Sequence, residues 1–180
     1  AANVPKDTVK RAIDKASGQN NDNFEEITYE GYGPKGIAVI IECLTDNKNR
    51  TVSELRYVLS KHGGSLGTNG SVSHLFRKIG ILKLLSISED DLLEHMENID
   101  IEDFELIDND CIIFTKPNIL FEAKKYFESK SIKVVDEEIS MDALTMVEIS
   151  IDDQEKISDL SSKIEELDDV QNVYMNVNLS

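Results

Sequence analysis

Residues 81–139, ILKLLSISEDDLLEHMENIDIEDFELIDNDCIIFTKPNILFEAKKYFESKSIKVVDEEI, carry the pattern that decides the fold of this chain. Short runs rich in isoleucine, valine and phenylalanine indicate strands, and longer segments with apolar residues three or four positions apart indicate helices. The predicted elements are, in order, a strand (Ile81–Ile87), a helix (Glu89–Asn98), two strands (Phe104–Ile107, Cys111–Thr115), a helix (Asn118–Ser129) and a strand (Lys133–Ile139). This βαββαβ order is that of a ferredoxin-like domain.

The flanking segments predict a second βαββαβ set, interrupted in its middle by the first. Ile27–Tyr32 and Ile37–Leu44 are predicted strands joined by the turn Gly33-Pro34-Lys35-Gly36. A helix with a capping box of Thr51 and Glu54 follows and ends at two glycines. The other predicted elements are a strand near Val72–Phe76, a strand Met146–Ile151, a helix Gln154–Leu167 and a strand Val170–Val177. The strand Ile37–Leu44 opens this second set.

The expected fold is therefore of the α+β class, with two ferredoxin-like βαββαβ-type domains, one inserted in the other. We expect a discontinuous domain of residues 24–80 plus 143–180 and an inserted domain of residues 81–142. Residues 1–20, with Pro5 in a first helical turn and Gly18 as its stop, predict the last helix of an α-helical N-terminal domain.

Composition limits the classes of protein that fit. The chain has 180 residues, of which 40% are hydrophobic and 30% charged, a balance typical of a globular protein with a packed core. With 35 acidic and 19 basic residues the net charge is −16, so the averaged surface repels nucleic acid and anionic membranes. No apolar run of about 18 residues and no basic-then-apolar leader is visible, and we expect no membrane contact. Cys43 and Cys111 lie in apolar runs and are expected to be buried thiols of a reducing compartment, the cytoplasm or, if a transit peptide preceded the chain, an organelle matrix.

Positive charge is concentrated in one segment. Residues 48–83 contain seven basic residues and one acid, Glu54, for a net +6, whereas the last 97 residues carry 7 basic and 26 acidic residues, a net −19. One interpretation is a basic face for a nucleic-acid backbone; the other is a solvated surface with salt bridges to the acidic second half. The candidate binding residues are Lys48, Arg50, Arg56, Lys61, His62, Arg77 and Lys78.

A glycine-rich run, HGGSLGTNGS over residues 62–71, lies inside this basic segment. It fits a loop whose exposed backbone amides approach phosphates, and it equally fits a helix stop followed by tight turns. It is not a Walker A loop, because no Gly-Lys-Ser/Thr ends it. The candidate loop residues are Gly63, Gly64, Gly67, Thr68, Asn69 and Gly70.

No pattern in the chain indicates catalysis. The three histidines lack metal-ligand spacing, and neither cysteine has a partner two or three residues away. The usual hydrolase, dinucleotide and metalloprotease patterns are missing from the sequence. We expect no enzyme, no catalytic residue, no cofactor and no metal.

Several long motifs resemble the YebC family of bacterial and organellar gene-expression regulators and together reach almost end to end. They are NVPKDT with RAI (residues 3–8 and 11–13), YEGYGP (29–34), ECLTDNKNRTV (42–52), HGGSLGTNGSV (62–72) and DDVQNVY (168–174). The resemblance implies a Lys/Arg-rich helical N-terminal domain followed by two α/β domains, and we expect residues 1–20 to be the last helix of the first. Lys35 stands where the family usually has glycine.

The resemblance implies a role in gene expression and leaves three hypotheses. The first is a translation factor that binds ribosomal or transfer RNA on the ribosome through the face of residues 48–83, since mitochondrial members look like translational activators and the family is linked to ribosomes translating proline-rich stretches. The second is a DNA-binding transcriptional regulator, the family's traditional label. The third is an adaptor that binds proteins through the acidic surface of residues 89–169. We rank them in this order and expect a monomer.

Overall fold

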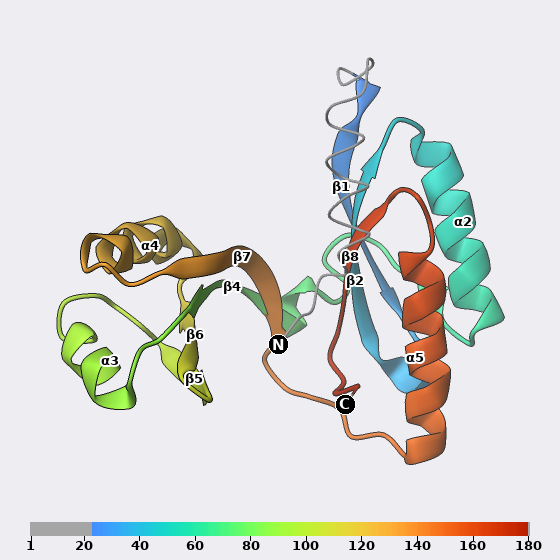
Figure 1. The fold of residues 1–180 in the computed structure, drawn as a ribbon. Helices are drawn as coiled ribbons and strands as arrows, with labels where there is room; N and C mark the ends of the chain where they lie inside the picture. The colour runs from blue at the N-terminus through green and yellow to red at the C-terminus, as the bar shows by residue number, and fades with distance from the viewer. Residues whose placement is uncertain (1–22, 180) are drawn as a thin grey trace. The chain divides into compact units, whose positions relative to one another are not determined.

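A computed structural model describes residues 23–179 as two compact units (Figure 1). Within the described residues, unit 1 comprises residues 23–77 and 143–179, and unit 2 comprises Lys78–Asp142. We propose that the two units are the two domains expected from the sequence. The helix predicted over residues 1–20 lies outside the described residues.

Unit 2 has the predicted ferredoxin-like arrangement. Its elements are β4 (Phe76–Leu84, whose first two residues belong to unit 1), α3 (Glu89–His95), β5 (Asp103–Ile107), β6 (Asp110–Thr115), α4 (Leu120–Ser129) and β7 (Val134–Ala143). The strand order in the sheet is β5-β6-β4-β7, and β6 pairs antiparallel with both β5 and β4. Each predicted element of this unit is present, and β4 begins five residues before the predicted start.

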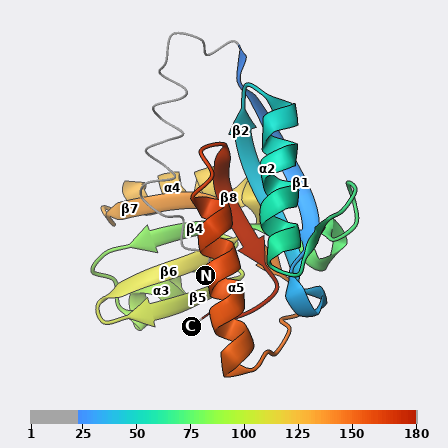
Figure 2. The ribbon, with the colours of Figure 1, turned by 90° about the vertical axis from the view of Figure 1, so that its right-hand side faces the viewer.

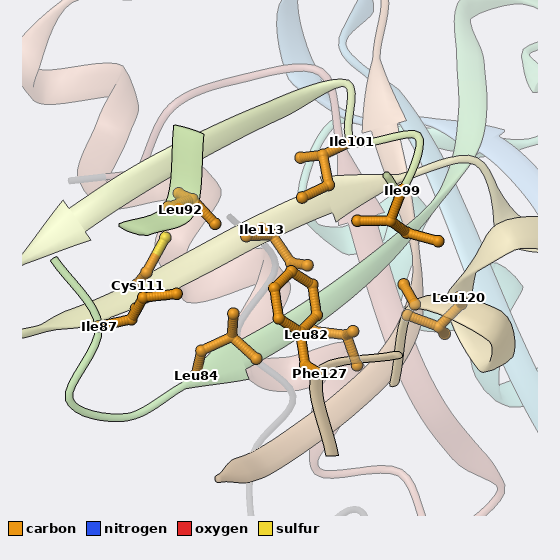
Figure 3. Packing of buried hydrophobic residues seen from close by; sticks show 11 residues of the cluster. Leu82, Leu84, Ile87, Leu92, Ile99, Ile101, Cys111, Ile113, Leu120 and Phe127 are labelled. Atoms are coloured by element: carbon orange, nitrogen blue, oxygen red, sulfur yellow. The ribbon is translucent and has the colours of Figure 1, made fainter. Parts of the chain in front are cut away.

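The core of unit 2 lies between its sheet and its two helices (Figure 3). Leu82 pairs with Ile113 and Leu84 with Cys111 across β4 and β6, so alternate residues of both strands share the helix-facing side. Phe127 of α4 is fully buried in the same cluster. Burial of each such side chain is worth about 1.5–3 kcal/mol. Burial also raises the pKa of the Cys111 thiol to about 11, and the buried cysteines agree with the prediction.

Unit 1 is a second four-stranded antiparallel sheet covered by two helices. Its elements are β1 (Glu25–Tyr32), β2 (Ala38–Thr45), α2 (Lys48–Lys61), β3 (Ser65–Leu66), α5 (Ile151–Glu165) and β8 (Val170–Met175). The strand order is β3-β1-β2-β8. The helices α2 and α5 lie side by side on one face of the sheet (Figures 1 and 2), where Leu55, Leu59, Leu160 and Ile164 meet Val39 and Ile41 of β2. The α+β class with two ferredoxin-like domains is thus confirmed.

Two strands predicted for unit 1 are wrong. Ser73–Leu75 is a single 3-10 turn, because the backbone amides of Val72 and Ser73 donate to a carboxylate, that of Glu30, and not to a neighbouring strand. In the segment 146–151, only Val147 forms an isolated bridge, to Val177, and α5 already begins at its end. The strands β1 and β3 complete the sheet instead, so the chain order of unit 1 is ββαβ followed, after unit 2, by αβ.

The turn between β1 and β2 contains a strained residue. Pro34–Gly36 forms a short 3-10 turn in which Lys35 has φ 62° and ψ 21°. This left-handed conformation brings Cβ close to a carbonyl oxygen and costs a non-glycine residue roughly 1–2 kcal/mol. Lys35 therefore occupies a backbone position that favours glycine.

Candidate nucleic-acid interface

Helix α2 carries four of the predicted binding residues and begins earlier than predicted. Its N-cap is Asn47, whose side-chain oxygen accepts a hydrogen bond from the backbone amide of Arg50 at 3.1 Å. The capping box predicted from Thr51 and Glu54 is wrong, because Thr51 is buried inside the first turn. The earlier start places both Lys48 and Arg50 on the helix.

Arg50 is held by carboxylates within unit 1. Its Nε and Nη2 donate to the two oxygens of Asp169 at 3.2 and 2.9 Å, and Nη2 also donates to Asp46 at 2.8 Å. The Asp169 side chain is only 2% exposed, and its Oδ2 also accepts a hydrogen bond from the Thr51 hydroxyl at 2.8 Å. These hydrogen bonds raise the pKa of Arg50, which stays charged. A fork-to-fork pair of this kind ties the start of α2 to the segment before β8.

Two further predicted binding residues also have partners in unit 1. The Lys48 ammonium lies 2.9 Å from the Glu25 carboxylate, a contact that raises the pKa of Lys48, but both side chains are more than half exposed. His62 lies at the end of α2, with Nδ1 2.8 Å from the Val58 carbonyl and Nε2 3.3 Å from Asp159 of α5. The exposed Lys48 pair is weak and easily exchanged for a phosphate, whereas His62 joins the two helices.

The remaining cations of α2 are Arg56 and Lys61, and Lys61 lies beside an exposed aromatic ring. The Tyr57 side chain is 64% exposed, and the Lys61 ammonium lies 5.6 Å from the centre of its ring. Arg56 is exposed, and neither cation forms an ion pair with any residue of the described range 23–179. Two free positive charges and a flat aromatic face are groups that contact phosphates and stack on bases. We call Arg56, Tyr57 and Lys61 the α2 patch.

The last two predicted cations lie on either side of the chain boundary between the two units. Arg77 and Lys78 are both exposed on β4, but the unit boundary falls between them. Arg77 has an interaction partner and is not a free cation. The structure therefore places Arg56 and Lys61 on the same helix of unit 1 and Lys78 on the other unit.

The glycine-rich loop is organised around Glu30, a residue of β1 that the sequence analysis missed. The buried Glu30 carboxylate accepts hydrogen bonds from the backbone amides of Gly70, Val72 and Ser73 at 2.7, 3.0 and 2.6 Å. Burial alone would raise the pKa of this carboxyl, but the backbone hydrogen bonds favour the charged form more, and its pKa lies below the ordinary value. Backbone amides at the end of the loop thus bind an anionic group, and that group is the carboxylate of Glu30.

Close packing at Gly64 and a positive φ at Gly70 account for two glycines of the same loop. A Cβ placed on Gly64 would lie 2.1 Å from the Tyr32 carbonyl oxygen, because the loop backbone runs against β1. Gly70 has φ +89°, which a side chain disfavours, and its amide donates to Glu30. These contacts match the interpretation as a helix stop followed by tight turns. Thr68 and Asn69 are the exposed tip.

The residues that the sequence analysis missed have few sequence signals. Asp169 lies 119 positions from Arg50, so only a structure or a covariation signal could pair them. Tyr57 has a sequence signal, because its position next to Arg56 on a helix with buried Leu55, Val58 and Leu59 places it outside the apolar stripe.

The described part of the chain contains neither a candidate metal site nor a candidate membrane span. Across residues 23–179, no three histidine, cysteine, aspartate or glutamate side chains are grouped so that they could hold a metal ion. No helix within that range is both long and apolar enough to span a membrane.

Comparisons with known proteins agree on one family. The family model described as the TACO1/YebC second and third domain matches residues 24–177. A probable transcriptional regulatory protein of Thermoanaerobacter pseudethanolicus is 43% identical over 183 aligned positions, which cover 99% of this chain and 74% of the relative. Another protein of that description, from Francisella philomiragia, is also 43% identical and covers 100% of this chain and 74% of its own length.

A solved structure supports the same assignment. The crystal structure of a conserved hypothetical protein from Aquifex aeolicus is similar to this chain, with a TM-score of 0.76 and 38% sequence identity. The similarity covers 97% of this chain and 73% of the other. The matched domains and the identity over nearly the whole length show that the chain belongs to the TACO1/YebC family.

Proposed function

We propose that this protein is a non-enzymatic regulator of gene expression that binds nucleic acid, and that its target is ribosomal or transfer RNA on the ribosome. The observation that carries the proposal is the α2 patch, in which Arg56 and Lys61 lack a carboxylate partner within residues 23–179 and Lys61 lies against the exposed ring of Tyr57. The proposed place of action is the cytoplasm or an organelle matrix, and the proposed active form is a monomer.

The chemistry of the patch favours RNA over duplex DNA. Sequence readout in a DNA groove uses side chains that pair with base edges, most often arginine or lysine with guanine and asparagine or glutamine with adenine. The two cations of the patch suit phosphates or guanine edges, so the preference rests on the exposed ring, which stacks on an unpaired base. Folded RNA presents both phosphates and unpaired bases, whereas duplex DNA keeps its bases stacked.

The charge of the whole chain makes this interaction local and sensitive to salt. With a net charge of −16, most of the surface repels a polyanion, and the attraction must come from a few unpaired cations. Each phosphate contact that is lost lowers the slope of log K against log salt by about one. Removal of Arg56 and Lys61 is therefore expected to weaken binding and to flatten its salt dependence together.

The second candidate function is transcriptional regulation through duplex DNA. It is favoured by the names of the relatives, which are called probable transcriptional regulatory proteins. It predicts that duplex DNA competes with RNA for the α2 patch.

The test is co-sedimentation with ribosomes at low and moderate salt, with duplex DNA as competitor. The variant R56E/K61E is compared with a matched control, K156E/K163E, which makes the same change of charge on α5 of the same unit. We expect the α2 variant to lose ribosome binding and the control to keep it. Equal binding by both variants would refute the role of the patch, and loss of wild-type binding to the DNA competitor would favour the second candidate.

A further inference from the structure

We infer that unit 2 carries a second binding site, which takes single-stranded nucleic acid, at Phe121 and Lys125 of α4. Phe121 is 65% exposed, and the Lys125 ammonium lies 4.4 Å from the centre of its ring. Lys125 forms no ion pair with any residue between 23 and 179. The site rests on the proposed nucleic-acid binding and lies on a different unit from the α2 patch.

The pair has the same geometry as the exposed ring and lysine of the α2 patch. In both, the lysine follows the aromatic residue by four positions on a helix, and the ring is about two thirds exposed, 65% for Phe121 and 64% for Tyr57. A ring in this setting has a cation close by and a face open to solvent. Each of the two units thus presents one such ring.

The charge around Phe121 is positive, in contrast to the acidic segments on either side. Residues 116–133 contain five lysines and two glutamates, a net +3 within a half of the chain that is otherwise strongly acidic. Lys124 is paired with Glu137 at 2.8 Å, but Lys125, Lys130 and Lys133 form no ion pair within the described range. A positive segment with an exposed ring fits an anionic partner that carries flat aromatic groups.

The partner with this chemistry is an unpaired stretch of nucleic acid. Bases of a single strand can stack on the exposed ring of Phe121 while the lysines contact the phosphate backbone. In a duplex the faces of the bases are stacked on one another and are not accessible to the ring. An acidic protein segment would satisfy the charges but would use Phe121 only as an apolar anchor. The two partners therefore differ in whether they require an aromatic ring or merely an apolar side chain.

Phe121 has no structural role in α4 that would make its replacement harmful. The helix is anchored to the core by Leu120, Ala123 and Phe127, which are buried. Its other aromatic residue, Tyr126, is half-buried, packs edge-on against Phe127 at 5.3 Å and shares a hydrogen bond of 2.9 Å with His95. Substitutions at Phe121 should therefore leave the fold intact, which circular dichroism and the melting temperature will verify.

The test measures fluorescence anisotropy of a labelled oligouridine RNA of about 12 nucleotides at about 50 mM salt. The variants are F121L, which keeps an apolar side chain, and F121W, which keeps a ring. We expect F121L to raise the Kd about fivefold or more, F121W to bind at least as tightly as the natural protein, and a duplex of the same length to be insensitive to both.

The outcomes separate this site from the proposed function. If the RNA binds but F121L and the natural protein have the same Kd, the second site is refuted while the α2 patch stands. If F121W weakens binding as much as F121L, the ring does not stack and the site is equally refuted. If the natural protein does not bind RNA at all, the proposed function fails as well. Cross-linking from 4-thiouridine RNA to the peptide containing Phe121 is the expected independent support.

Discussion

The substitution Glu30→Gln tests whether one buried carboxylate organises the glycine-rich loop. The natural side chain accepts three backbone hydrogen bonds, from Gly70 at 2.7 Å, Val72 at 3.0 Å and Ser73 at 2.6 Å. A glutamine can keep its carbonyl oxygen towards Val72 and Ser73, but its NH₂ group then faces the amide of Gly70, donor against donor. The loop should therefore lose one bond completely and the charge assistance of the others.

The expected cost is about 2–4 kcal/mol of unfolding free energy. Hydrogen bonds to a charged group contribute about 1.5–3 kcal/mol each, and the part-buried amide of Gly70 also loses its acceptor. Denaturation by urea, followed by circular dichroism, measures the total. Amide hydrogen exchange at Gly70, Val72 and Ser73 shows whether the loss is local, and we expect faster exchange there than in unit 2.

The pH dependence provides a sharper version of the same test. Because the folded-state pKa of Glu30 lies below its ordinary value of 4.5, the carboxylate adds stability that is fully present above pH 4.5 and is lost as the pH falls through the folded pKa. The stability difference between the natural protein and the Glu30→Gln variant should therefore be constant above that pH and shrink in more acidic solution. An equal difference at all pH values, or no difference at neutral pH, would refute this account of the loop.

Three further substitutions test contacts and backbone strain within unit 1. Arg50→Ala should lower the unfolding free energy by about 2 kcal/mol, because it leaves the buried Asp169 carboxylate with fewer donors. Lys48→Ala removes only an exposed ion pair and should leave the unfolding free energy nearly unchanged. Urea denaturation compares the two variants, and equal effects would contradict the role of Asp169. Lys35→Gly should raise the melting temperature, with a gain of about 0.5–1 kcal/mol, because it relieves a φ of 62° at some cost in unfolded-chain entropy, and a lower melting temperature would show that the strain is absent.

The sequence predicted unit 2 better than unit 1 for a physical reason. In residues 81–139 each strand and helix has its own periodicity. Consecutive strands are either adjacent in the sheet, as β5 and β6 are, or connected along the chain through a single helix. In unit 1 the edge strand Ser65–Leu66 has two residues, too few for any periodicity. In residues 72–76 the buried residues Val72 and Phe76 lie on either side of a 3-10 turn and not in one strand. A local sequence pattern cannot show that the backbone amides of Val72 and Ser73 will donate hydrogen bonds to the distant carboxylate of Glu30.

The candidate site shows the same division. The basic segment was visible from charge alone, and Arg56 and Lys61 are indeed exposed. Two carboxylates that contact Arg50 and His62, those of Asp169 and Asp159, lie about a hundred residues further along the chain. Sequence reasoning therefore located the cations but could not distinguish those that hold the fold from those that remain free.

The placement of β8 at the edge of β2 has a consequence for biosynthesis. The pairs Val39–Met175 and Ile41–Val173 join residues more than 130 positions apart, so the sheet of unit 1 cannot be completed until almost the whole chain has been translated. Unit 2, by contrast, is continuous from Lys78 to Asp142 and is synthesised before α5 and β8 exist. We expect unit 2 to fold first on the ribosome. Until β8 is synthesised, the edge of the apolar strand β2 that pairs with β8 stays unpaired. During that interval the nascent chain is exposed to strand-edge aggregation and to chaperones.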